Sequence, residues 1–212
     1  MPRSSLRRPV AQAICESRVW ERETLDLLRG TDPGGDIVHA GTFFGDFIPA
    51  LAHSRAAGAR VWAFEPNREN YECARVTVML NDLHNVTLTH AGLDVHAGSA
   101  LLATKGPTGK PLGGGSHLIS DRQPADGQGG EEVNLVAVDE ALDGDRRVAV
   151  IQLDVEGHEQ QALAGAMRTI ARWLPLLVLE TPPPESWLAE NLAPLGYRVA
   201  GTADANTVLR HD

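Results

Sequence analysis

The sequence contains few cysteines and no long hydrophobic run. Its two cysteines, Cys15 and Cys73, lie far apart and match no metal-binding spacing, which favours free thiols in a reducing compartment. No apolar stretch approaches the roughly 20 residues needed to span a bilayer, and the basic segment at residues 1–9 lacks the apolar run of a secretion signal. We therefore expect a cytoplasmic protein with no membrane partner.

Positive charge and aromatic side chains are also scarce. The 212 residues include 19 Lys and Arg against 28 Asp and Glu, which gives a formal net charge of −9. Because a nucleic-acid backbone binds to a positive surface, this balance argues against a nucleic-acid partner. With 5% aromatic residues, the core must consist largely of Leu, Val and Ala. The length predicts one domain over residues 1–212, in which residues 1–30 form a helical segment.

Short apolar runs alternate with segments of helical periodicity along the chain. Strands are expected at 36–40, 60–66, 85–93, 147–157 and 175–184, and helices at 10–28, 47–59, 67–83 and 158–174. A strand followed by a short helix is expected at 131–142, and a hairpin at 196–211. Such alternation predicts an α/β fold, with a mostly parallel sheet, helices on both faces and an antiparallel edge at the C-terminal hairpin.

Residues 98–131 are rich in glycine and proline, and we predict a loop insertion there. Its ends lie near the carboxyl ends of predicted strands, where ligands bind in sheets of this kind. Leu118 and Ile119 would be unusual in a fully solvated loop. We therefore expect the loop to form part of a substrate pocket, with Ser116 and His117 as polar contacts.

The segment IVHAGTFFGDF indicates a ligand-binding turn between the first strand and the next helix. Gly41 and Gly45 allow a sharp turn and a close approach to a ligand, although two glycines can also serve helix–strand packing alone. Glu65 ends the second strand 20 residues after Gly45. An acid at that position is suited to accept hydrogen bonds from both hydroxyls of a ribose that carries no 2′-phosphate.

A second group of polar residues follows the apolar strand at 147–153. Asp154 and Glu156 are expected to project from its carboxyl end, and His158 comes in the first turn of the next helix. His158 could equally be solvated, and Glu159 could serve the helix dipole. Asp154 and His158 are candidate general bases, with Glu156 third. A divalent metal is less favoured, because acids close in sequence need not converge.

Four segments in this order, WERETLDLL, HAGTFFGDF, AFEPNRENYE and IQLDVEGHEQQALAGA, resemble the FkbM family of S-adenosylmethionine-dependent methyltransferases. The most specific is D-x-E-G-x-E followed by a helix of small apolar residues. The resemblance spans Trp20 to Tyr197. It implies a class I methyltransferase (Rossmann-like) fold with seven strands, S-adenosyl-L-methionine as cofactor, S-adenosyl-L-homocysteine as product, and methyl transfer to a hydroxyl of a small-molecule acceptor such as a sugar or secondary metabolite.

The resemblance also implies roles for individual residues. It places the methionine part of the cofactor over the turn after the first strand, the ribose at the end of the second, adenine at the end of the third and the sulfonium near Asp154, under a covering segment at residues 21–24. The cofactor-binding residues so implied are His39, Gly41, Thr42, Phe43, Gly45, Glu65, Pro66, Asn67, Gly92, Leu93, Asp154, Glu21 and Thr24.

The chain departs from the family pattern at the first strand. The usual sequence D-x-G-x-N-x-G is replaced by H-x-G-T-F-F-G, so His39 stands in place of the acid and Phe43 in place of the Asn. The acid helps to orient the methionine ammonium. A neutral His39 could accept a hydrogen bond, whereas a cationic His39 would repel the ammonium.

Two other functions fit part of this pattern. A nicotinamide dinucleotide oxidoreductase would also need a glycine-rich turn and a ribose-binding acid, but the glycines here do not match G-x-G-x-x-G. A non-catalytic cofactor-binding module of the same fold would account for His39. The acceptor and the oligomeric state are not encoded in any motif that we identify.

Overall fold

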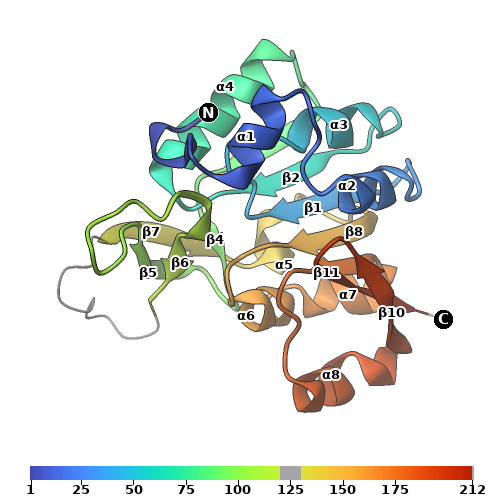
Figure 1. The fold of residues 1–212 in the computed structure, drawn as a ribbon. Coiled ribbons are helices and arrows are strands. Elements are labelled where there is room, and N and C mark those ends of the chain that lie inside the picture. Colours follow the sequence, from blue (N-terminus) through green and yellow to red (C-terminus); the bar gives the residue numbers. More distant parts are fainter. Residues whose placement is uncertain (120–129, 212) are drawn as a thin grey trace.

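The computed structural model describes residues 1–119 and 130–211, and a seven-stranded sheet crosses its centre (Figure 1). The strand order is β10-β11-β9-β8-β1-β2-β3. The strands are β1 (Asp36–Ala40), β2 (Val61–Phe64), β3 (Val86–Thr89), β8 (Val148–Leu153), β9 (Leu176–Leu179), β10 (Tyr197–Ala203) and β11 (Asn206–His211). The five strands from β9 to β3 are parallel, and β10 and β11 form an antiparallel hairpin at the edge. The predicted fold class is confirmed.

Helices cover both faces of this sheet (Figure 1). They are α1 (Pro9–Cys15), α2 (Arg22–Arg29), α3 (Ile48–His53), α4 (Arg68–Leu80), α5 (Val138–Ala141), α6 (Glu159–Ala164), α7 (Met167–Trp173) and α8 (Glu185–Asn191). One core packs α2 and α3 on the sheet, and the other packs α6 and α7 on the opposite face. No described helix has the length and apolar content that a membrane crossing requires.

The alternation of side chains along β1 decides which residues face which core. Val38 and Ala40 lie in the core that includes α6 and α7, whereas Ile37 lies in the core with α2 and α3. His39 therefore points to the same face as Ile37. All five residues of β1 are buried, because β2 and β8 flank it on both sides.

A second, four-stranded sheet lies beside the central sheet (Figure 1). Its order is β4-β7-β5-β6, with β4 (Gly92–Leu93), β5 (Gly98–Ala103), β6 (His117–Leu118) and β7 (Gly130–Val136). The prediction of a loop over residues 98–131 is therefore wrong for part of that range, because residues 98–103 pair with residues 130–135 in an antiparallel ladder. Residues 120–129 of that loop lie outside the described residues.

Three other sequence predictions need correction. The strand expected at 85–93 is two strands, since β3 ends at Thr89 and β4 pairs with β7 in the second sheet. The helix expected at 47–59 ends at His53, and α8 was not predicted at all. The helix expected at 158–174 is broken at Gly165, where the backbone carbonyl of Asp94 comes too close for a side chain.

Gly165 provides a test of this packing. A Cβ atom there would lie 2.0 Å from the Asp94 carbonyl oxygen, whereas a Cβ atom on Gly98 would meet no atom within 4 Å. We expect Gly165→Ala to lower the free energy of unfolding by about 2–3 kcal/mol, because the backbone must shift to relieve the overlap. Gly98→Ala is the matched control and should stay within about 0.5 kcal/mol of the parent. Urea denaturation measures both, and equal midpoints for the two variants would contradict the close contact.

Candidate active site

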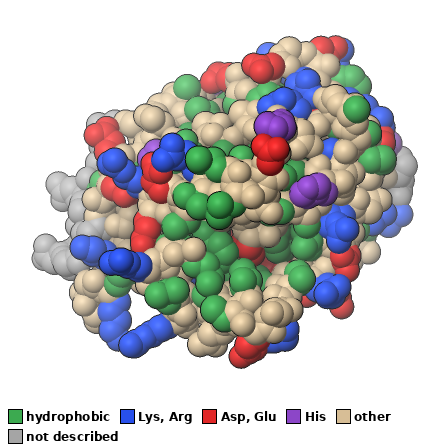
Figure 2. All heavy atoms as spheres, turned by 90° about the horizontal axis from the view of Figure 1, so that it is seen from above, with side chains coloured by type: hydrophobic (Ala, Val, Ile, Leu, Met, Phe, Trp, Pro, Cys, Tyr) green, Lys and Arg blue, Asp and Glu red, His purple; other side chains and the backbone are tan. Residues whose placement is uncertain are grey.

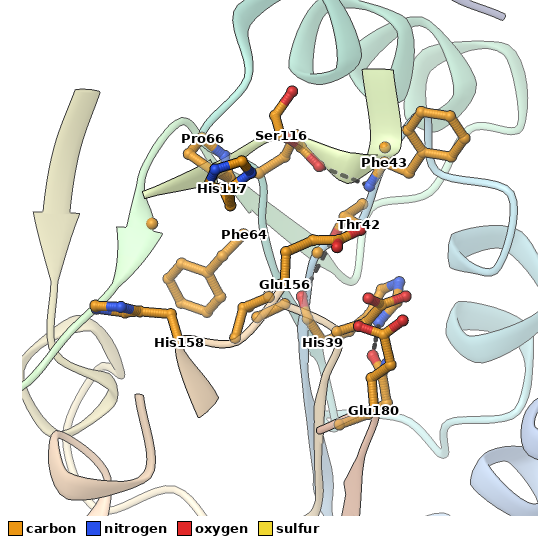
Figure 3. A pocket seen from close by; sticks show the side chains of 18 of the residues that line it. His39, Thr42, Phe43, Phe64, Pro66, Ser116, His117, Glu156, His158 and Glu180 are labelled. Carbon is orange, nitrogen blue, oxygen red and sulfur yellow. Dashed lines mark hydrogen bonds between the residues drawn. The ribbon is translucent and has the colours of Figure 1, made fainter. Parts of the chain in front are cut away.

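A cavity of about 340 Å³ lies at the carboxyl ends of β1, β2, β8 and β9. The second sheet and the N-terminal segment complete its walls, through side chains such as Leu102, Leu118, Arg8 and Trp20. Figure 3 shows its polar side chains, which come from several elements and converge on one space. Fourteen of the site residues predicted from the sequence line it: Glu21, His39, Gly41, Thr42, Phe43, Glu65, Pro66, Gly92, Leu93, Ser116, His117, Asp154, Glu156 and His158.

The turn after β1 runs against the end of β8. Gly41 has a φ of +77°, and a Cβ atom there would lie 1.7 Å from the carbonyl oxygen of Asp154. Only glycine satisfies both conditions. Phe43 also has a positive φ, of 55°, and its backbone N–H donates to Glu65 Oε2 at 2.7 Å. The backbone of this turn is therefore fixed by β8 on one side and by Glu65 on the other.

Glu65 is 4% exposed and lines the cavity. Besides Phe43, the backbone N–H of Asn67 donates to its Oε1 at 2.8 Å. Burial raises the pKa of Glu65 to about 7, although these hydrogen bonds act in the opposite direction. Asn70 Nδ2 also donates to Oε1 at 3.5 Å, whereas Oε2 keeps a lone pair beyond its contact with Phe43, so Glu65 can still accept a hydrogen bond from a ligand.

His39 is 4% exposed and stacks on Phe47 with a centroid distance of 5.9 Å. Its Nδ1 is hydrogen-bonded to the side-chain oxygen of Gln152, its neighbour across β1 and β8. Because an amide oxygen only accepts, Nδ1 carries the proton. Burial lowers the pKa of His39 to about 4, so the ring is neutral at physiological pH. The sequence left the charge of His39 open, and the structure assigns the neutral form.

Three carboxylates meet at the ends of β8 and β9. Oxygen atoms of Asp154, Glu156 and Glu180 lie within 4.8 Å of one another. Burial raises the pKa of Asp154 well above its ordinary value, and the neighbouring Glu180 raises it further. Burial and Glu180 also raise the pKa of Glu156. These acids have the ligand chemistry for a hard cation, and they can equally share protons, so their proximity alone does not identify a metal centre.

His158 and Glu159 do not join that carboxylate cluster. His158 Nε2 is 3.0 Å from Asp94 Oδ2, and Figure 3 shows His158 on the far side of the pocket from Glu180. Glu159 is buried, and it accepts a hydrogen bond from the backbone N–H of Val155. His158 is therefore held at the edge of the cavity by Asp94.

Three residues that the family resemblance implied do not line the cavity. Thr24 is buried under the hairpin, where its Oγ1 donates to the carbonyl of Ala203. Gly45 packs against Ala74 of α4 with a φ of +81°. Asn67 caps α4 by accepting from Asn70 N. Each of these supports a neighbouring element instead of facing the cavity.

Several lining residues were missed by the sequence analysis. They include Arg8, Trp20, Asp46, Phe64, Gln152 and Glu180. Glu180 carried a usable signal, since it directly follows the apolar strand β9 just as Asp154 follows β8. Arg8 carried none, because its approach to the cavity depends on how the N-terminal segment packs.

Comparisons with known proteins identify the family and the fold of this chain. A family model described as the methyltransferase FkbM domain matches residues 39–198. An FkbM methyltransferase from Methylobacillus flagellatus superposes with a TM-score of 0.55 at 19% identity, over 84% of this chain and 43% of that one. A methyltransferase from Geobacter sulfurreducens gives a TM-score of 0.50 at 16% identity, over 95% and 85% of the two chains. A search of curated proteins found no match.

Both structural relatives share the α/β sheet and place this chain among proteins of that fold. The family match covers most of the chain, and the protein belongs to the FkbM methyltransferase family. The chain spans less than half the length of the Methylobacillus flagellatus protein.

Asp154 gives a prediction about pH. A carboxyl whose pKa is raised in the folded state holds its proton there and loses it when unfolded, so stability falls as pH rises above the ordinary carboxyl pKa of about 4. Asp154→Asn removes this penalty. We expect the variant to be more stable than the parent, on the order of 1–3 kcal/mol at pH 8 and less at pH 5. Chemical denaturation at both pH values measures this difference, and an advantage that does not change with pH would refute the raised pKa.

Proposed function

We propose that this protein transfers the methyl group of S-adenosyl-L-methionine to a hydroxyl oxygen of a small molecule, such as a sugar or a secondary metabolite. Family membership supports methyl transfer. The observation that carries the proposal is the buried Glu65, which faces the cavity beside the glycine turn at the carboxyl ends of the strands.

The residues present fit this cofactor. Glu65 supplies a carboxylate for the ribose hydroxyls, and Gly41 keeps the turn clear of side-chain atoms. Phe64, Gly92 and Leu93 give an apolar wall suited to adenine. When bound, S-adenosyl-L-methionine supplies an electrophilic methyl group on a sulfonium.

The chain's own task is then to position the acceptor and remove its proton. Asp154 lies at the end of β8 with Glu180 beside it. Burial and the neighbouring acid make the Asp154 carboxylate a stronger base than an exposed aspartate, because both favour its protonated form. In this mechanism the ionised form of Asp154, which the positive charge of a bound cofactor would favour, accepts the hydroxyl proton, and Glu180 stabilises the protonated state through a hydrogen bond. His158 is the alternative base, at the other side of the cavity.

A small-molecule acceptor is supported by the shape of the site. The cavity is bordered by the second sheet and by residues 8–10, and its volume of about 340 Å³ is in the range of sites that bind small molecules. Figure 2 shows Lys and Arg side chains scattered among Asp and Glu on the face drawn, without a continuous basic surface of the kind that nucleic acids need. With the net charge of −9, this distribution favours a small-molecule acceptor over a nucleic acid.

Cofactor titration tests the first half of the proposal. We expect calorimetry to show binding of S-adenosyl-L-methionine and S-adenosyl-L-homocysteine but not of NAD. Glu65→Gln should weaken both affinities by roughly 10- to 100-fold, the loss associated with one charge-assisted hydrogen bond. Glu72→Gln, a change of the same type on the exposed surface of α4, is the control and should bind like the parent. Binding of NAD in preference to S-adenosyl-L-methionine would favour the oxidoreductase alternative.

A turnover screen tests the second half. Methyl transfer from labelled cofactor to a panel of sugars and hydroxylated metabolites should identify an acceptor, and the methylated atom should be oxygen. Asp154→Asn should then reduce turnover by roughly 100-fold or more while cofactor binding persists, since loss of a general base typically costs that much. Unchanged turnover in Asp154→Asn would remove Asp154 as the base, and binding without turnover on any acceptor would favour a non-catalytic module.

A further inference from the structure

The second nitrogen of His39 has no protein partner among the described residues. Nε2 is buried and makes no hydrogen bond, although His39 lines the cavity. A buried polar atom without a partner lowers stability, and in native proteins it calls for an explanation. We propose that neutral His39, held by Gln152, accepts a hydrogen bond from the α-ammonium group of the cofactor, and that Glu21 and Asp46 supply the negative charge that an acid on the first strand would otherwise provide.

The orientation of His39 is set from two sides. Gln152 is 3% exposed and lies directly opposite His39 in the β1–β8 register, and its side-chain oxygen takes the Nδ1 proton. Phe47 stacks on the ring with an interplanar angle of 12°. With one edge and one face occupied, the lone pair on Nε2 is the remaining polar feature of the ring. A ligand that satisfies it must donate a hydrogen bond.

The neighbouring charged groups favour a cationic donor. Glu21 and Asp46 line the same cavity, and Glu21 acts on Asp46 electrostatically. Burial, together with the charge of Glu21, raises the pKa of Asp46 to about 6. A cation between the two carboxylates relieves their repulsion. An ammonium group offers three N–H donors and one positive charge, which matches two carboxylates and one neutral acceptor nitrogen.

A metal ligand role fits His39 less well. Among the described residues, the acids whose ligand oxygens gather within 4.8 Å of one another are Asp154, Glu156 and Glu180, and His39 does not belong to that group. The inference rests on the proposed function, because it assigns a place to one part of the proposed cofactor. It also explains how the chain can dispense with the first-strand acid of its family.

The test separates the ammonium contact from cofactor binding as a whole. The probes are S-adenosyl-L-homocysteine and its analogue in which hydrogen replaces the α-amino group, both titrated by calorimetry. The parent should bind the amine roughly 10- to 100-fold more tightly than the analogue. His39→Leu should reduce this ratio to below about 3-fold while affinity for the analogue is retained, which also shows that the variant is folded. His39→Asp should restore the preference.

His84→Leu is the matched control, since His84 is exposed and should leave the ratio unchanged. A full preference for the amine in His39→Leu would overturn the inference, although the proposed function would stand. Failure of the parent to bind either probe would instead refute the proposed function.

The tautomer gives a readout that does not depend on cofactor binding. Imidazole ¹⁵N NMR of the free protein should show His39 protonated on Nδ1 and not on Nε2. Gln152→Leu should shift His39 to a mixture of tautomers and should lower the amine preference in calorimetry. An Nε2-protonated His39 in the parent would overturn the inference, because that nitrogen would then be a donor and could not receive an ammonium.

Discussion

The site depends on one close approach between two backbones. Where β1 ends, Gly41 passes so near the carbonyl of Asp154 that no side chain fits between them, and the Asp154 N–H donates to the Ala40 carbonyl at 3.1 Å. The pairing of β1 with β8 therefore continues to the last residues of both strands. This contact places the turn that would carry the cofactor directly beside the acid that would remove the acceptor proton. A change in either strand end moves both functions together.

Backbone hydrogen bonds extend this constraint to the second strand. Glu65 accepts from the backbone of Phe43 in the turn and from the backbone of Asn67 at the start of α4. Asn67 in turn caps α4 and its side chain donates to Ser116 Oγ at 3.1 Å, which ties the segment before β6 to the same point. The walls of the cavity are therefore held by main-chain geometry, and this leaves little conformational entropy to lose when a ligand binds.

The electrostatics of the cavity oppose stability and favour binding. Burial raises the pKa of Asp46 and Glu65, and it raises that of Asp154 with Glu180 beside it, so the folded protein holds acids where their ionised forms are disfavoured. His39 sits neutral among them with an unfilled acceptor nitrogen. Buried polar atoms without a partner also occur at Ser5, Asn70 and Gln161, but among these four residues only His39 lines the cavity, where a ligand can complete its interactions. A cationic ligand that donates hydrogen bonds would stabilise the ionised acids and would also pair with the free nitrogen of His39.

The sequence by itself determined the order of the main strands and helices along the chain, the parallel sheet with its terminal hairpin, and the positions of Gly41, Glu65 and Asp154. These features follow from local periodicity, turn chemistry and short spacings. The second sheet could not be predicted, because residues 98–103 find their partners about 30 positions away and their pairing depends on contacts that local sequence does not contain.

The break at Gly165 likewise depends on the backbone of Asp94, which only the fold brings close. Tertiary structure alone also decided that Glu180 joins Asp154 and that Gln152 fixes the proton on His39, since these contacts cross between neighbouring strands. Burial then sets the charge of each group, and burial is a property of the packed molecule and not of the residue.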